Sequence, residues 1–330
     1  MSTIHDVAKL AGVSVSTASN AINGKGYVKD TTRQAVLDAA ERLSYRPSGA
    51  ARNLKLKHTK IIGLIAFDAA GPVHSAIISG AMRRAEESGY EAILCNSHYR
   101  EDRVLSSLLS YKMLDACVVM SPELDDATLR DLSRSTFPIV AIDRDIQGDN
   151  LGCVLMDDYA SAHGIARLFR DRGFTEIGYI GPNPAEHHVR DVSERNRGFL
   201  DGVREYGLRL PEERHRYGDF TIPTGQRCME EMLRLAPPPR AVFAANDEMA
   251  LGALRAIREK GLRIPEDIAL IGFDDIPFAT FAMPPLSTVR RPLYNLGEAA
   301  VDLLLGVMKS RSATHCRTLP TEIVLRGTLV

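Results

Sequence analysis

The pattern of hydrophobic and polar positions changes character near residue 60. Before it, apolar residues recur every three or four positions in short runs, which predicts helices over residues 4–11, 15–22 and 31–44. After it, short apolar runs alternate with longer amphipathic segments, which predicts a parallel sheet covered by helices on both faces. The chain therefore divides into a small helical head and a large α/β body.

The head has the pattern of a helix-turn-helix. Thr3, with Asp6 three residues on, is a predicted N-cap for the first helix, and Gly12 suits a left-handed end to that helix. Ser14 is the predicted N-cap of the second helix, which stops before "NGKG". Two short helices joined by a tight turn and braced by a third form a compact unit of the kind that binds DNA.

The body repeats its own pattern. "KIIGLIAFD" opens a series of strands and helices, and "EIGYIGPN", about 115 residues later, opens a second. Two doubly wound halves are therefore expected, with ligands bound at the carboxyl ends of the strands. Strands are predicted at 61–67, 91–96, 116–121, 139–143, 176–181, 216–220, 241–246 and 268–274. Helices are predicted at 74–90, 101–113, 126–135, 195–207, 224–236 and 247–261.

Composition and charge narrow the class of protein. The 330 residues are 45% hydrophobic and 25% charged, as in soluble globular proteins, and neither a secretory signal nor a membrane span is recognisable, so we expect a cytoplasmic location. The first 60 residues hold ten Lys or Arg and four Asp or Glu, a net charge of +6, which leaves −7 for the rest. A basic head on an acidic body is expected when one domain meets a polyanion.

The five cysteines are widely spaced and lack a Cys-x-x-Cys pair, which favours small core residues over a disulfide framework or a zinc site. No metal and no cofactor is expected. Motifs for dinucleotide binding, phosphate loops, nucleophile elbows and zinc proteases are missing from the sequence, so we expect no catalysis. An enzyme or a solute-binding protein on the same core fold remains the alternative of a different class.

Segments spread along the chain match one known architecture in order. "TIHDVAKLAGVSVSTASNAING", "YRPSGAARNLKLKHTKIIGLI", "AANDEMALGAL", "IPEDIALIGFDD" and "PPLSTVRRP" resemble the helix-turn-helix, the hinge and three core segments of the lactose/galactose-repressor family of bacterial transcription regulators. The resemblance implies an α/β fold with a helix-turn-helix head and a two-lobed, periplasmic-binding-protein-like core of doubly wound parallel sheets. The implied boundaries are 1–46 for the DNA-binding domain, 47–59 for the hinge and 60–330 for the effector-binding and dimerisation core, with one lobe at about 60–158 and 292–319 and the other at about 159–291 and 320–330.

The resemblance also implies which residues touch DNA. The second helix would lie in the major groove, where Val15 meets a thymine methyl, Ser16 donates or accepts, and Asn20 pairs with adenine unless it touches a phosphate instead. Hinge helices of a dimer would pack in the minor groove, with Leu54 as an apolar wedge that unstacks the central base step. The further implied contacts to the DNA backbone and the hinge site are Thr3, Thr17, Ser19, Tyr27, Thr32, Arg33, Ala50, Arg52 and Lys55.

An effector site between the two halves is implied as well. Arg195 would bind ligand hydroxyls or a carboxylate through its rigid fork of donors, and Asp274 would accept hydrogen bonds from sugar hydroxyls or base nitrogens. Phe220 would stack on the ligand. The remaining implied positions are Asp68, His74, Asp143, Arg144 and Asn246. His74 departs from the aromatic residue common in the family, which points to a charged or phosphorylated ligand rather than a plain hexose.

The function implied by these features is ligand-controlled repression. We expect a homodimer that binds a palindromic operator and regulates a carbohydrate-utilisation operon, with release by a sugar-type effector. The alternative within the same class is a co-repressor-dependent regulator that binds a nucleobase or a phosphorylated metabolite. Asp143 and Arg144 pairing with each other, and Asp247 capping the helix that follows it, are the simpler structural readings of those residues.

Overall fold

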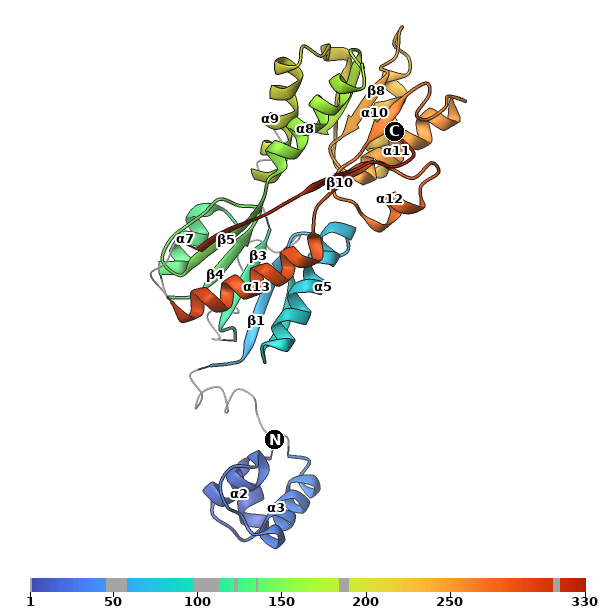
Figure 1. The fold of residues 1–330 in the computed structure, drawn as a ribbon. Coiled ribbons are helices and arrows are strands. Elements are labelled where there is room, and N and C mark those ends of the chain that lie inside the picture. Colours follow the sequence, from blue (N-terminus) through green and yellow to red (C-terminus); the bar gives the residue numbers. More distant parts are fainter. Residues whose placement is uncertain are drawn as a thin grey trace. The chain divides into compact units, whose positions relative to one another are not determined.

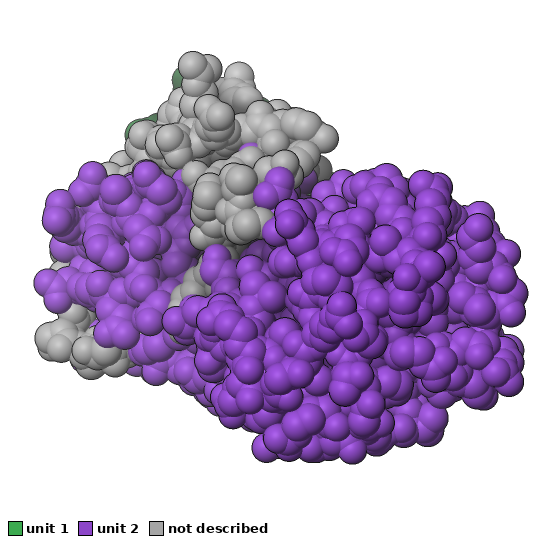
Figure 2. All heavy atoms as spheres, turned by 90° about the horizontal axis from the view of Figure 1, so that it is seen from above, with its two compact units in different colours: residues 1–59 green, residues 60–330 purple. Residues whose placement is uncertain are grey.

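The computed structural model describes residues 2–45, 58–97, 113–121, 124–134, 136–183, 190–310 and 315–330 (Figure 1). The chain divides into two compact units, residues 1–59 and residues 60–330, coloured separately in Figure 2. The hinge at 47–59 falls almost entirely outside the described residues, and so does the helix expected at 101–113. Each unit is described below by itself.

The first unit is a three-helix head. Its helices are α1 (Ile4–Leu10), α2 (Val15–Asn23) and α3 (Asp30–Arg42), each within two residues of the expected bounds. Thr3 and Asp6 form a reciprocal capping box, and the hydrogen bonds from the Thr3 backbone N–H and hydroxyl lower the pKa of Asp6. Val7, Ala18 and Val36 are buried between the helices. Small side chains on α2 therefore let its axis approach the other two.

The second unit contains two lobes. In the first lobe, described strands form a six-stranded parallel sheet in the order β11-β5-β4-β3-β1-β2. Alternate strand residues face a core beneath α5 and α13 on one side and a core beneath α7 on the other. Figure 1 shows α5 and α13 side by side on one face. The bounds are β1 Ile61–Ala66, α5 Pro72–Glu87, β2 Glu91–Asn96, β3 Ala116–Met120, α7 Asp126–Arg134, β4 Ile139–Ile142, β5 Leu151–Met156, α13 Leu293–Lys309 and β11 His315–Leu319.

The second lobe has a smaller parallel sheet, which in the described chain has four strands in the order β7-β6-β8-β9. The helices α8 and α9 pack as one pair and α10 and α11 as another (Figure 1). The bounds are α8 Asp158–Asp171, β6 Ile177–Pro182, α9 Arg190–Glu205, a 3-10 turn η1 Glu212–Arg214, β7 His215–Gly218, α10 Ile222–Met232, β8 Ala241–Ala244, α11 Asp247–Glu259, β9 Ala269–Ile271 and α12 Pro277–Phe281.

The chain passes between the lobes more than once. Strand β5 runs into α8, and the antiparallel pair β10 (Thr288–Arg290) and β12 (Glu322–Val324) connects the second lobe to α13 and β11 of the first. Each lobe is therefore built from separate stretches of chain. The sequence pattern predicted the strands from β1 to β9 except β5, and the elements that it missed include β5, α8, α12, β10, α13, β11 and β12.

Two glycines of helix α13 differ sharply in what surrounds them. A Cβ at Gly297 would lie 2.0 Å from the carbonyl oxygen of Ile77 on α5, whereas a Cβ at Gly306 meets no described atom within 4 Å. We expect Gly297→Ala to lower the free energy of unfolding by about 1–3 kcal/mol through overpacking. Gly306→Ala should raise it by about 0.5–1 kcal/mol, because alanine is the better helix former.

Urea unfolding of both variants beside the parent protein measures the difference. Equal effects of the two alanines, or a stabilising Gly297→Ala, would contradict the close packing of α5 against α13 at this point.

Candidate functional site

A cluster of charged side chains lies buried where strands of both lobes end. Asp143 follows β4, Asp158 follows β5, Asp274 follows β9, Arg291 follows β10, and Arg195 comes from α9. Asp158, Arg195, Asp274 and Arg291 are each 5% exposed or less, which is rare for charged residues unless they are paired. The carboxyl ends of parallel strands are where doubly wound folds bind ligands, so this cluster is the candidate effector site.

Arg195 is fixed by contacts on several sides. Its guanidinium donates to Asp158 Oδ2 at 2.9 Å and to the carbonyl of Ala245, and its Nη2 lies 3.6 Å from Asp274 Oδ1. The guanidinium also lies over the Phe273 ring, 3.8 Å from its centroid. A planar donor group held on an aromatic face is oriented before any ligand arrives, which lowers the entropy that binding must offset.

Arg291 connects the two lobes. It donates to Asp143 Oδ2 at 2.5 Å and to Asp274 Oδ1 at 3.4 Å, and its Nε lies 3.5 Å from Asp158 Oδ1. Asp143 belongs to the first lobe and Asp274 to the second, so one guanidinium holds carboxylates of both. The sequence left open that Asp143 and Arg144 pair with each other. In the structure Asp143 pairs with Arg291, whereas Arg144 pairs with Asp126.

The backbone around this cluster adopts left-handed conformations. The φ angles are 55° at Asp143, 68° at Phe220 and 108° at Asp274. A non-glycine residue in this region costs on the order of 1–3 kcal/mol, and such residues concentrate at ligand sites. All three positions are among those that the sequence nominated for effector binding, so the strain supports that nomination on independent grounds.

Asn246 holds the site together rather than facing away from it. Its Oδ1 accepts from the Met249 N–H at 2.9 Å as the N-cap of α11, and its Nδ2 donates to the Phe220 carbonyl at 2.9 Å. Asn246 is therefore the cap of α11, and the simpler reading of Asp247 as that cap is wrong. Phe220 packs partly buried against the core of the second lobe.

The other positions nominated for effector binding, Asp68, His74 and Arg144, differ in their contacts. Asp68 follows β1 and accepts from the Ala70 N–H at 3.0 Å. Burial, together with the charges of Asp274 and Asp68, raises the pKa of Glu248. His74 is half-buried in the first turn of α5. Arg144 is directed away, with an ion pair to Asp126 at 3.5 Å and hydrogen bonds to the carbonyls of Leu124 and Ser121.

Asp247 is a fully buried carboxyl beside the cluster. It accepts from the Ile276 N–H at 2.8 Å and from the Thr288 hydroxyl at 2.6 Å. Burial and the neighbouring Asp274 raise the pKa of Asp247 well above its ordinary value of 3.8. Its contribution to stability is therefore full below about pH 3.8 and is lost as the pH rises through the folded-state pKa.

Asp247→Asn should flatten this part of the pH dependence. The amide can accept from Ile276 and donate to Thr288, so folding is retained, and the variant should gain stability over the parent as the pH rises above about 3.8. Asp247→Ala is the control, because it leaves the Ile276 N–H buried without its partner and should lose about 1–3 kcal/mol at every pH. Urea unfolding at several values between about pH 4 and pH 8 measures the free energy of unfolding of the parent and of both variants. Identical pH profiles for the parent and Asp247→Asn would refute the raised pKa.

The second helix of the head presents a polar face. Ser16 and Asn20, four residues apart on α2, are exposed, while Ala18 and Ala21 on the opposite side are buried. Val15 packs partly into the core of the head. Of the nominated base-reading residues, Ser16 and Asn20 are thus the two that face outward.

The remaining nominated DNA contacts fall into different settings. Thr17 Oγ1 lies 2.8 Å from Ser14 Oγ, and Ser19 accepts from Asn23 through its carbonyl at 2.7 Å, so both hydroxyl residues have partners within the head. Tyr27 is 93% exposed, so its side chain is open to solvent. Thr3 serves the capping box, Thr32 and Arg33 are half-buried on α3, and Ala50, Arg52, Leu54 and Lys55 lie outside the described residues.

Comparisons with known proteins place both units in one family. Residues 3–48 match the family described as "Bacterial regulatory proteins, lacI family", and residues 166–329 match a periplasmic binding protein-like domain. The HTH-type transcriptional repressor PurR of Mannheimia succiniciproducens is 37% identical over 95% of this chain and 94% of its own. The chain belongs to the lacI family of bacterial regulatory proteins.

Solved structures of lacI-family proteins share the whole architecture. The lac repressor dimer bound to operator and the anti-inducer ONPF aligns with a TM-score of 0.83 at 25% identity, over 100% of this chain and 99% of that one. The complex of the transcriptional regulator CelR with cellobiose aligns with a TM-score of 0.74 at 28% identity, over 99% and 100%. The chain is therefore a ligand-responsive transcriptional repressor of this family, and the expected fold class is confirmed.

The sequence missed two members of the buried cluster. Asp158 is the first residue of α8, two residues after β5 ends, and Arg291 lies within "PPLSTVRRP", one of the segments that carried the family resemblance. The rule that ligand residues follow parallel strands would have found Asp158 had β5 been recognised.

Among the described residues, no helix combines the length and apolar character needed to cross a membrane.

Proposed function

We propose that this lacI-family repressor acts in the cytoplasm as a homodimer that binds a palindromic operator and takes a nucleobase as co-repressor at the buried charge cluster. Asn20 and Ser16 would read base edges in the major groove, with Val15 against a thymine methyl and Tyr27 and Arg33 on the backbone. Thr3, Thr17, Ser19 and Thr32 would add backbone contacts. The similarity to the lac repressor dimer bound to operator supports this arrangement.

The net charge of the cluster indicates which class of ligand it can bind. Arg195 and Arg291 contribute two positive charges, whereas Asp143, Asp158 and Asp274 contribute three negative ones. A net negative, buried site disfavours phosphate and carboxylate ligands by direct repulsion. It favours a neutral ligand rich in N–H donors, which carboxylate oxygens accept, with one edge for a guanidinium.

A nucleobase fits this chemistry better than a phosphorylated metabolite, and its planar ring suits stacking on Phe220. Similarity to repressors named PurR, at 37% identity, exceeds the 28% found for the cellobiose complex and supports the nucleobase over a sugar. The sugar-type inducer expected from the sequence therefore becomes the second candidate, with the cellobiose complex as its supporting observation.

The mechanism proposed for the response is a shift between two arrangements of the lobes. A ligand that inserts among Arg195, Asp274 and Arg291 would exchange direct pairs for ligand-mediated ones across both lobes, which changes their relative position. Since coupling is reciprocal, operator DNA should raise the affinity for the effector by the same factor that the effector raises the affinity for operator.

Operator binding measured by fluorescence anisotropy tests the proposal. An operator selected from a randomised palindromic library would be titrated alone and with guanine, hypoxanthine, adenine, uracil, glucose or cellobiose. A nucleobase should tighten binding by about 5- to 150-fold. If a sugar weakened operator binding instead, the effector would be an inducer and not a co-repressor. If the protein showed no salt-dependent preference for the selected operator over random DNA, the proposal that it regulates transcription by binding an operator would be refuted.

A further inference from the structure

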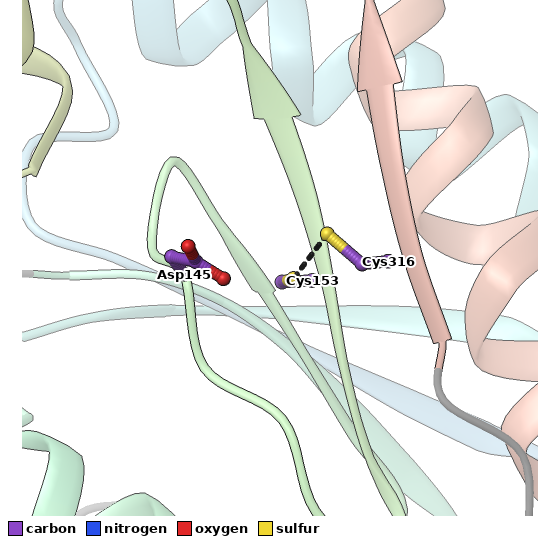
Figure 3. A group of neighbouring side chains, drawn as sticks. All are labelled: Asp145, Cys153 and Cys316. Atoms are coloured by element: carbon purple, nitrogen blue, oxygen red, sulfur yellow. Dashed lines mark hydrogen bonds between the residues drawn. The ribbon is translucent and has the colours of Figure 1, made fainter.

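Two cysteines that are far apart in the sequence lie side by side in the first lobe. Cys153 on β5 and Cys316 on β11 are directly opposite each other in the parallel pairing of these strands, and their Sγ atoms are 2.8 Å apart. Cys153 is buried, whereas Cys316 is exposed, so the expectation that all five cysteines are core residues is wrong for Cys316. Figure 3 shows the two sulfurs meeting between the strands.

A carboxylate completes the group. Asp145, in the connection between β4 and β5, is exposed and points toward the two cysteines (Figure 3). One ligand atom from each of Asp145, Cys153 and Cys316 lies within 4.8 Å of the other two. Ligands at about 2.0–2.3 Å from a tetrahedral zinc ion are spaced closely enough that small rotations of these side chains would reach that geometry.

We propose that Asp145, Cys153 and Cys316 form a binding site for a thiophilic divalent cation of the zinc class, with a fourth position open to water. Two thiolates and one carboxylate supply three negative charges and the soft ligands that such cations select.

The two thiols of this group bind such a cation only in their deprotonated form. A bound cation displaces both thiol protons to solvent, since a coordinating thiol is deprotonated outright.

Asp145 favours a cation over the other chemistry open to two adjacent thiols. In a disulfide the carboxylate has no role, and its charge opposes formation of the attacking thiolate. In a cation site the Asp145 carboxylate is itself a ligand. Occupancy would tie the edge strand β11 to the connection between β4 and β5, and both cysteine-bearing strands lead directly into connections to the second lobe.

Cobalt(II) is the probe of choice, because cobalt–thiolate bonds give a charge-transfer absorption that cobalt bound to histidine or carboxylate alone lacks. The full-length protein, reduced and stripped with a chelator, would be titrated with CoCl2. We expect a thiolate-to-cobalt band that saturates at one cation per chain and is abolished by added Zn²⁺. Cys316→Ser, an exposed position that leaves the core intact, should remove the band.

Matched variants separate the site from general effects. Asp145→Asn should weaken cobalt affinity at least about tenfold, while Asp149→Asn, an exposed carboxylate on the same connection, should leave it unchanged. Cys228→Ser removes a buried cysteine of the second lobe and should also leave the band unchanged. A parent protein with both thiols titratable but no cobalt–thiolate band overturns the proposal. Loss of two titratable thiols with a mass lower by two hydrogens overturns it in favour of a disulfide.

Discussion

Arg195→Ala is expected to abolish the effector response while operator binding survives. The change removes the donors to Asp158 and Ala245 and the ion pair with Asp274, which leaves the two buried carboxylates to share Arg291. Loss of one partner of a buried pair costs about 3–5 kcal/mol of stability. Effector affinity should fall by on the order of 100-fold or more, because a buried charged contact in a binding site is worth about 2–5 kcal/mol.

A matched arginine in the same lobe separates binding from folding. Arg214 is 5% exposed, pairs with Glu176 and donates to the Pro237 carbonyl at 2.8 Å, away from the cluster. Arg214→Ala should therefore lose comparable stability but keep the effector response. Calorimetric titration with the active compound, at a temperature where all variants are folded, provides the measurement. Unchanged effector affinity in Arg195→Ala, or equal loss in both variants, would remove Arg195 from the site.

Asn20→Ala is expected to lower specific operator affinity by about 1–3 kcal/mol with little effect on binding to random DNA. Asn20 is exposed on the polar face of α2, and its amide can bond two atoms of an adenine edge. Asn20→Arg should move the preference at that base pair from adenine towards guanine, since a guanidinium matches the acceptors of guanine.

Asn23→Ala provides the control on the same helix. The Asn23 amide donates to the Ser19 carbonyl at 2.7 Å at the end of α2, so its loss should change operator affinity by less than about threefold. Anisotropy titrations against operators varied at one base pair give the comparison. If Asn20→Ala weakened selected and random DNA equally, Asn20 would be a backbone contact rather than a base reader.

Continuous burial made several strands predictable from the sequence, although the partly exposed β2 and β7 were predicted as well and the fully buried β5 was missed. β1, β3, β8 and β9 are apolar runs covered on both faces, which the sequence displays directly. β11 reads "HCRTL", with exposed residues at the edge of the sheet, so its apolar signal is weak. α13 is strongly apolar, but its return to the first lobe depends on contacts with α5 that periodicity cannot encode.

The candidate site shows the same division between local and tertiary information. Arg195 and Asp274 followed from a family resemblance, and the structure brings both into the buried cluster. A family resemblance assigns positions in the sequence, but it does not say in which direction each side chain points. Arg144 sits next to Asp143 in the sequence, yet it turns to Asp126 while Asp143 turns to Arg291. Which arginine serves the cluster is decided by packing between distant segments.

The placement of α13 and β11 has a consequence for synthesis on the ribosome. The head, residues 2–45, has its own core and can fold as soon as it leaves the exit tunnel. The sheet of the first lobe cannot be completed early, because one of the two helices that cover one of its faces begins at Leu293 and its edge strand begins at His315. Between the synthesis of β5 and that of α13, the part of this face that α13 covers stays exposed, while the head can already be folded. A nascent chain of this protein should therefore need chaperone protection of residues 61–156 until residues 293–319 are made.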